Sequence, residues 1–328
     1  MSTQASIRTA AATAAPGASA ATSARPQQPR APRQRRRPIA PYALIVPSVI
    51  VLILAMGYPL IWQLITSTQQ FGLAQQFGQP APFVGLQNYV KLATDPYMWT
   101  VILRSLAFCL ACAAITMVIG TLLALLMNVV ARWVRVLLQI TLLLAWAMPV
   151  VAAMTVWTWL LNLRSGVVNW MLSAIGLPFQ GHNWLINPIS FFGVALVIVV
   201  WMSVPFVSFA VYAGLTQVSG EVIEAAQMDG ASPRQRFFGI TVPIIRPVIS
   251  IVLLLQVIWD LRVFTQIKLL QSAGSVKSET NLLGTYIYQL GTGSSDFGMA
   301  SAVSVFVLVL TVAISAFYVR SMLKEDES

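Results

Sequence analysis

The sequence predicts an all-α integral membrane protein with six membrane-spanning helices. Of its 328 residues, 57% are hydrophobic and only 9% are charged, and the mean hydropathy is positive. A soluble domain of this composition would lack the polar side chains needed to cover its surface. The chain also contains apolar runs of about 20 residues, the length at which a helix crosses the hydrocarbon core of a bilayer.

The first 41 residues differ in composition from the rest of the chain. They are rich in Ala, Ser, Pro and Arg, and we expect residues 1–41 to form a disordered basic arm in the cytoplasm. The first span runs from Tyr42 to about Ile65. The preceding arginines and Ala55-Met-Gly57 also allow an export signal with a weak cleavage site, but the apolar run is long enough to span, which favours an uncleaved helix.

Five more apolar runs complete the predicted membrane domain, residues 42–320, which is followed by a cytoplasmic tail at 321–328. Pro149 predicts a kink in the third span, and Pro205 lies inside the fourth. Polar segments broken by Gly and Pro separate the runs and predict loops. The expected second to sixth spans cover about 101–129, 136–161, 189–215, 247–267 and 298–318.

The positive charges give the orientation of these spans. Under this topology 14 of the 20 Lys and Arg residues lie on one side of the membrane, together with both chain ends. Because cytoplasmic loops are enriched in Lys and Arg, that side is predicted to be cytoplasmic in a plasma membrane. The same distribution explains the net charge of +10 better than nucleic-acid binding does.

The sequence shows no metal-binding pattern. Cys109 and Cys112 stand inside an apolar run without a second pair of ligands, so we expect two small buried residues and no metal site. His182, the only histidine, falls in an external loop, where a solvated surface position is expected.

Between the fourth and fifth spans lies a mostly polar stretch, residues 219–246, which we call the corner segment. Its sequence predicts two short helices that meet at Gly230, a residue able to end a helix in the left-handed conformation. Ser219 is placed to cap the first helix, with Glu221 in its first turn. Ser232 begins the second helix with Pro233 at its first position and Gln235 three residues after the cap, a capping-box pattern.

One face of the first short helix suits a docking partner. Glu221, Glu224, Ala225 and Met228 share that face, and small alanine side chains allow close approach to the backbone. Asp229 falls in the last turn, an unfavourable end for an acid, and two interpretations stay open. It either caps the next helix or belongs to the docking surface.

The corner segment resembles the cytoplasmic coupling loop of permease subunits in binding-protein-dependent ABC importers. The resemblance rests on Glu224-Ala-Ala, Gly230, Ile240 and Pro243 at fixed spacing, and Asp229-Gly-Ala resembles the carbohydrate branch, the maltose and oligosaccharide type. Val242 stands where that family usually has Leu. Shorter family-like segments are Phe83–Tyr89, Gly166–Asn169, Asn183–Pro188, Thr280–Tyr286 and Asp296–Ala300, whereas Leu270–Ser278 departs from the family pattern.

The resemblance implies a six-helix ABC importer permease bundle with a cytoplasmic coupling helix between spans 4 and 5. Implied partners are a second homologous permease, two copies of a cytoplasmic ATPase and an extracytoplasmic solute-binding protein, besides membrane lipid. No Gly-x-x-x-x-Gly-Lys-Ser/Thr motif occurs, so ATP and Mg would bind the partner ATPase, and this chain is expected to be no enzyme and to hold no cofactor. The residues implied in ATPase coupling are Glu224, Ala225, Ala226, Asp229, Gly230 and Arg234.

The fifth span contains the residues that are most costly to place in a bilayer, Asp260 and Arg262. Such residues face a water-filled path by default, but pairing with neighbouring helices is an equally open interpretation. On a continuous helix, the polar and aromatic side chains of this span lie within an arc of about 120°. Amide, carboxylate and indole groups suit a sugar. The predicted substrate path comprises Gln256, Trp259, Asp260, Arg262 and Gln266, and Trp157, Trp159 and Trp201 either line it or only pack in the bundle.

Other classes of protein fit the sequence less well. An ion-coupled secondary carrier predicts an inverted repeat or acids along several spans, and neither is visible. An ABC permease for phosphate, a metal or a peptide is an alternative for cargo, but the spans hold no cluster of cationic or metal-ligating side chains. A membrane enzyme would need a nucleophile with its base or a set of metal ligands.

Overall fold

The computed structural model describes residues 40–326, in which every named element is a helix. The chain divides into two units, residues 1–53 and 54–328. The predicted arm lies outside the described residues up to position 39. The described part of the first unit is mainly α1 (Ala40–Leu52), an apolar helix with Pro47 inside it.

The second unit begins within a π-helical turn, η1 (Ile53–Gly57), and continues as α2 (Tyr58–Ser67). α2 packs against the last long helix, α16 (Phe297–Asp326). The helical apolar stretch Leu44–Ser67 is long enough to cross a membrane, as the first predicted span requires. Helical geometry in α16 continues through most of the predicted tail, 321–328.

The second span starts earlier than the sequence analysis placed it. Two short helices, α3 (Leu73–Gln76) and α4 (Gln87–Thr94), precede α5 (Pro96–Val129). Asp95 caps α5 because its Oδ1 accepts a hydrogen bond of 2.9 Å from the backbone N–H of Tyr97. With Pro96 at the first helical position, this cap begins the helix five residues before the predicted position 101.

The third predicted span is broken into α6 (Arg132–Ala147) and α7 (Val150–Leu160). Their axes differ by 97°, so the kink expected at Pro149 is a near-perpendicular turn and α7 does not continue along α6. A proline disfavours the helical conformation in the residue before it, and Met148 is extended, with ψ of 125°. Proline marks where the helix ends, but the direction of the next helix depends on what it packs against. α7 packs against α13 (Thr265–Ser272).

The centre of the second unit is the contact between α5 and α9 (Pro188–Leu215), which follows α8 (Val167–Ala174). Close approach is possible because α5 carries Gly120. A Cβ at that position would lie 2.5 Å from Val207 Cγ1 of α9. Pro205 lies inside α9, as predicted, and α6 packs on the same helix.

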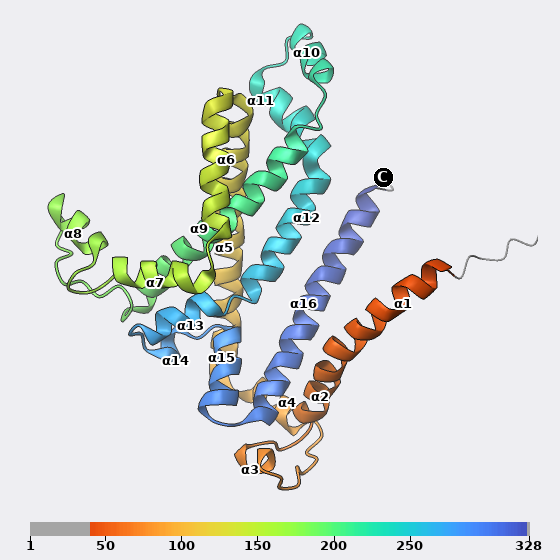
Figure 1. Ribbon diagram of the computed structural model, residues 1–328, viewed down its shortest axis with the longest axis vertical. Helices are drawn as coiled ribbons and strands as arrows, with labels where there is room; N and C mark the ends of the chain where they lie inside the picture. The colour runs from red at the N-terminus through yellow and green to blue at the C-terminus, as the bar shows by residue number, and fades with distance from the viewer. Residues whose placement is uncertain (1–39, 327–328) are drawn as a thin grey trace, which may run out of the picture. The chain divides into compact units, whose positions relative to one another are not determined.

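After α9 the chain forms the corner segment and then α12 (Val242–Leu261), which packs against α5, α9 and α16. In Figure 1 the corner lies at one end of α12, and α13, α14 (Lys277–Thr280) and α15 (Leu283–Tyr288) lie toward the other. A π-helical turn, η3 (Gln289–Gly293), leads on toward α16. Within residues 40–326, five helical stretches are long and apolar enough to span, or six if α6 and α7 count as one.

Candidate functional site

The corner segment has the two-helix form that its sequence predicts. α10 (Gly220–Met228) is followed by α11 (Pro233–Arg236), and Gly230 between them has φ of +78°, in the left-handed region. Glu221 lies in the first turn of α10. Ser219 is the N-cap residue of that helix, but its side chain makes no capping hydrogen bond, so only its position is as predicted.

The second short helix is held by a complete capping box. The backbone N–H of Gln235 donates to Ser232 Oγ at 3.4 Å, and the backbone N–H of Ser232 donates to Gln235 Oε1 at 2.8 Å. Asp229 is the C-cap residue of α10 and is exposed. Ser232, not Asp229, therefore caps α11, and the capping interpretation of Asp229 is wrong.

Most of the corner surface is uncovered in this chain. Glu224, Ala225 and Arg234 are exposed, Ala226 is half-buried, and Met228 is 87% exposed. α10 projects beyond the other helices at its end of the second unit, as Figure 1 shows. Another protein could cover the surface formed by the Glu224 carboxylate, the alanine side chains and the exposed Met228.

In the fifth span the structure brings two of the predicted path residues together. Gln256 and Asp260 are buried, one turn apart, and Gln256 Nε2 donates to Asp260 Oδ2 at 2.9 Å. The other amide atom, Gln256 Oε1, is buried and makes no hydrogen bond. Burying a polar atom without a partner costs free energy, so this pair is better satisfied when another hydrogen-bonding group can reach it.

The other predicted path residues lie apart from this pair. Trp259 is 46% exposed, with its ring 4.8 Å from that of Phe206. Arg262 is exposed at the end of α12. The prediction of a shared helical arc is wrong for Gln266, which lies on α13 beyond a non-helical break and places its amide nitrogen 3.7 Å from the sulfur of Met202.

Two of the three tryptophans proposed for the same cavity meet each other. The rings of Trp157 and Trp201 pack edge to face with centroids 5.9 Å apart, whereas Trp159 is 58% exposed. Cys109 and Cys112 are buried thiols, as predicted. Among the described residues no group of three His, Cys, Asp or Glu side chains is placed to hold a metal ion.

Comparison with known proteins assigns the chain to a family. Residues 117–322, which include α9, the corner segment and α12, match the family described as "Binding-protein-dependent transport system inner membrane component". The chain belongs to this family. The permease, as we now call it, is thus a membrane subunit of a transport system that works with a binding protein.

Two curated relatives match 88% and 73% of the permease. It is 37% identical over 290 residues to the "Diacetylchitobiose uptake system permease protein DasB" of Streptomyces coelicolor, with 88% of each chain covered. It is 33% identical to the "Trehalose/maltose transport system permease protein MalF" of Thermococcus litoralis, over 73% of this chain and 79% of the relative.

A solved structure supports the same fold. One chain from the crystal structure of a bacterial alginate ABC transporter in complex with an alginate pentasaccharide-bound periplasmic protein matches 85% of the permease with a TM-score of 0.73. That match covers 92% of the solved chain at 26% identity. The fold is therefore that of an ABC transporter permease, as the sequence predicted.

Two family-like segments far from the corner are joined in the permease. Asn169 of α8 donates from Nδ2 to the carbonyl oxygen of His182 at 2.9 Å and accepts at Oδ1 from Trp184 Nε1 at 2.6 Å. The His182 ring also packs edge to face on Trp184, with centroids 4.7 Å apart. His182 lies in a loop, as predicted, but it is half-buried against Trp184 and is less solvated than expected.

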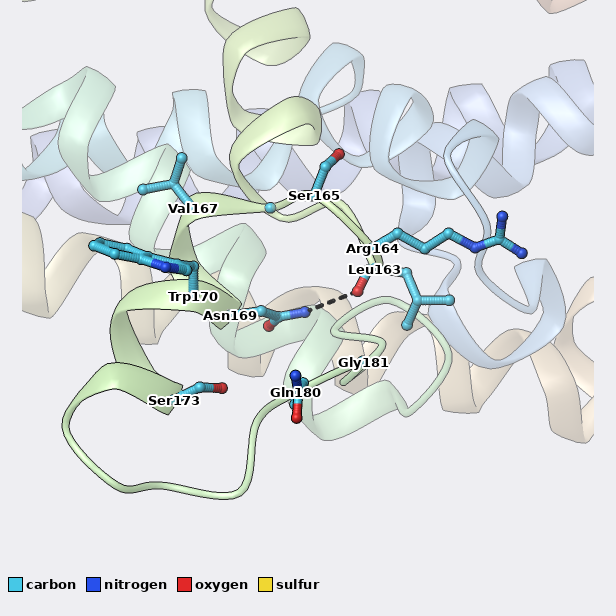
Figure 2. Close-up of a pocket in the computed structure, with 10 residues that line it drawn as sticks. Leu163, Arg164, Ser165, Val167, Asn169, Trp170, Ser173, Gln180 and Gly181 are labelled. Atoms are coloured by element: carbon cyan, nitrogen blue, oxygen red, sulfur yellow. Dashed lines mark hydrogen bonds between the residues drawn. The ribbon is translucent and has the colours of Figure 1, made fainter.

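A pocket of about 290 Å³ opens beside this junction (Figure 2), between the α8 helix and the loop that carries Gln180 and Gly181. Asn169 also donates to the carbonyl oxygen of Leu163, at 3.4 Å. The Ser173 hydroxyl is buried and has no hydrogen-bond partner. Sequence reasoning missed this pocket, because the pairing of Asn169 with Trp184 depends on the fold of the whole loop.

Proposed function

We propose that the permease translocates a sugar, as an oligosaccharide, in an importer driven by a separate ATPase. The cargo proposal rests on relatives named for diacetylchitobiose and trehalose/maltose uptake and on the solved alginate transporter. The proposed assembly contains a second homologous permease, two copies of the ATPase with its ATP and Mg, and an extracytoplasmic solute-binding protein. The solved relative includes a periplasmic protein that holds the saccharide.

The observation that carries the coupling proposal is the exposed, self-capped corner joined to a spanning helix. From Pro233 to Leu261 the helical elements α11, η2 (Phe237–Thr241) and α12 follow one another without a loop. An ATPase bound to the corner would therefore displace α12 directly. The contact residues proposed are Glu224, Ala225, Ala226, Asp229, Gly230 and Arg234.

The chemistry of the contact follows from the exposed groups. The alanines allow the backbone of α10 to approach a partner closely, and Glu224 offers a carboxylate for a basic residue of the ATPase. The corner would lie in the cytoplasm, on the same side as both chain ends, because that side holds most of the Lys and Arg residues.

For the substrate path we propose Gln256 and Asp260, together with Trp259, Arg262 and Gln266, which lie apart from that pair in this conformation. In this conformation Gln256 and Asp260 hydrogen-bond to each other and are buried. Rocking of the bundle during alternating access would open this contact to the path. A sugar hydroxyl can donate to Gln256 Oε1 or Asp260 while it accepts from the amide nitrogen.

The test is Glu224→Lys in the complete transporter, reconstituted in lipid vesicles with its ATPase and binding protein. Reversal of the charge would place a lysine against the proposed basic residue of the ATPase. We therefore expect ATP-driven sugar uptake to fall at least a hundredfold while the permease still inserts. Gln79→Lys, at an exposed position after α3, introduces the same cation away from the corner segment and should transport normally. Normal uptake by the Glu224 variant contradicts the coupling site, and uptake that depends on a proton gradient but not on ATP contradicts the ABC mechanism.

A further inference from the structure

A small pocket outside the corner and the proposed path carries positive charge. It is formed by residues of α13, α14, α15 and η3. Figure 1 shows α13, α14 and α15 toward the end of α12 that is far from the corner segment. The 20 residues of α12 separate the two sites by about 30 Å, the thickness of a bilayer core. The pocket has a volume of about 110 Å³ and is lined by Lys268, Gln271, Lys277, Asn281, Thr285, Tyr288, Gln289, Thr292 and Gly293.

Buried hydrogen bonds fix the walls of this pocket. Gln271 donates from Nε2 to Asn281 Oδ1 at 3.1 Å, and Asn281 donates from Nδ2 to Gln289 Oε1 at 2.5 Å. The same Asn281 nitrogen donates to the hydroxyl of Tyr97, at the start of α5, at 2.9 Å. Gln271, Asn281 and Thr285 are each less than 5% exposed. The pocket is thus pre-organised, which lowers the entropic cost of binding.

The charge of the pocket is unbalanced. Lys268 is half-buried, and its ammonium nitrogen lies 4.2 Å from the centroid of the Tyr288 ring. No lining residue is an acid, and neither lysine forms a salt bridge within the described residues. Glu279 follows Lys277 by two residues but is exposed and does not line the pocket. A partly desolvated cation beside a second cation favours an anion as ligand.

The volume of the pocket limits which anionic groups it can hold. Small-molecule sites usually enclose about 300–1,000 Å³, so a pocket of about 110 Å³ accepts one functional group and not a whole sugar ring. A carboxylate at the tip of a protein side chain fits this size. The pocket also lies on the side of the membrane where the proposed function requires a soluble partner.

We propose that Lys268 and Lys277 bind an acidic side chain of the extracytoplasmic solute-binding protein. This proposal rests on the proposed function and adds the docking contact on the outer face. Because charge pairs across an interface steer association, the contact predicts faster and salt-sensitive binding of that protein.

The experiment measures binding of the transport system's own binding protein to the complete transporter in nanodiscs, at several salt concentrations. For Lys268→Gln combined with Lys277→Gln, we expect affinity to fall about tenfold to a hundredfold, mainly in the association rate, with a weaker dependence on salt. Lys91→Gln, at an exposed position of α4, removes a lysine outside the pocket and should stay within about twofold of the wild type. Lys268→Arg with Lys277→Arg should retain the salt dependence.

Two other results would overturn the proposed docking contact. Unchanged affinity and salt dependence in the double glutamine variant would overturn the docking contact. Normal docking with selective loss of uptake of an acidic sugar would assign the pocket to cargo and also overturn the proposal. Failure of the proposed function has a separate signature, because the wild-type permease would then bind neither an ATPase nor a solute-binding protein in the same preparation.

Discussion

The two ends of α12 are built in different ways. At one end the corner segment is held by interactions between residues close in sequence, such as the Ser232 and Gln235 capping box. At the other end the segment from Thr265 to Gly293, the outer platform, is tied to α5 by bonds that join residues about 180 positions apart. The two short helices of the corner are therefore held locally, although Ile245 near the end of the segment packs into the core, whereas the outer platform forms only when the whole bundle has folded.

The exposure of polar side chains also differs between the two ends of α12. In the outer platform the polar side chains of Gln271, Thr280 and Asn281 are buried, while the corner shows Glu224 and Met228 to solvent. Buried bonds hold the outer platform in one shape, because breaking them leaves polar groups without partners.

The largest effect that tests this comparison is expected for Asn281→Ala. The substitution removes hydrogen bonds to Tyr97, Gln271 and Gln289, so buried groups lose partners and stability should fall by about 3 kcal/mol. Thermal unfolding in nanodiscs measures the loss. Gln180→Ala, at an exposed site in another loop, should change the midpoint little. Equal midpoints for both variants would mean that the buried bonds do not hold the outer platform.

A smaller effect is expected for Gly230→Ala. A residue with a Cβ costs about 1–2 kcal/mol in the left-handed conformation, so the turn between α10 and α11 should distort while the bundle stays folded. ATP-driven uptake should fall severalfold with little change in the unfolding midpoint. Gly193→Ala, at an exposed position of α9, is the control, because its Cβ would meet no atom within 4 Å and its φ is not positive. A fall in global stability as large as that of Asn281→Ala would contradict the independence of the corner.

Ser232→Ala should have a smaller and more local effect. Loss of an N-cap costs about 1 kcal/mol, and here it removes one half of the capping box. Hydrogen exchange should become faster in the amides of α11 and remain unchanged in α15. Faster exchange at both ends of α12 would show that the corner is not held locally.

The last prediction concerns alkaline pH and the outer platform. Burial, followed by the charge of Asp95, raises the pKa of Tyr286 to about 12, above its usual value of 10. The folded state therefore holds the proton more tightly, and the contribution is complete below pH 10 and is lost as pH rises from about 10 to 12. Tyr286→Phe should show a weaker fall of the unfolding midpoint in that window. An identical pH profile would mean that this phenol does not titrate with folding.

The contrast between the two ends also explains what the sequence could predict. Gly230, Ser232 and Pro233 act on their own neighbours, so the two-helix corner follows from local rules. The end of α12 at Leu261 was missed, because the apolar residues Val263 and Ile267 continue the hydrophobic pattern through the break. The pocket at Lys268 was missed for another reason: its walls depend on Asn281 meeting Tyr97.

The π-helical turn η2 joins α11 to α12. It is the one departure from α-helical geometry between Pro233 and Leu261 in the described chain. If an ATPase binds the corner segment as proposed, its displacement would pass from α11 through η2 to the Gln256–Asp260 contact in α12. Because helices bend at π-turns and at prolines, bending along this path is expected at Phe237–Thr241 and at Pro247, which lies inside α12 before Gln256.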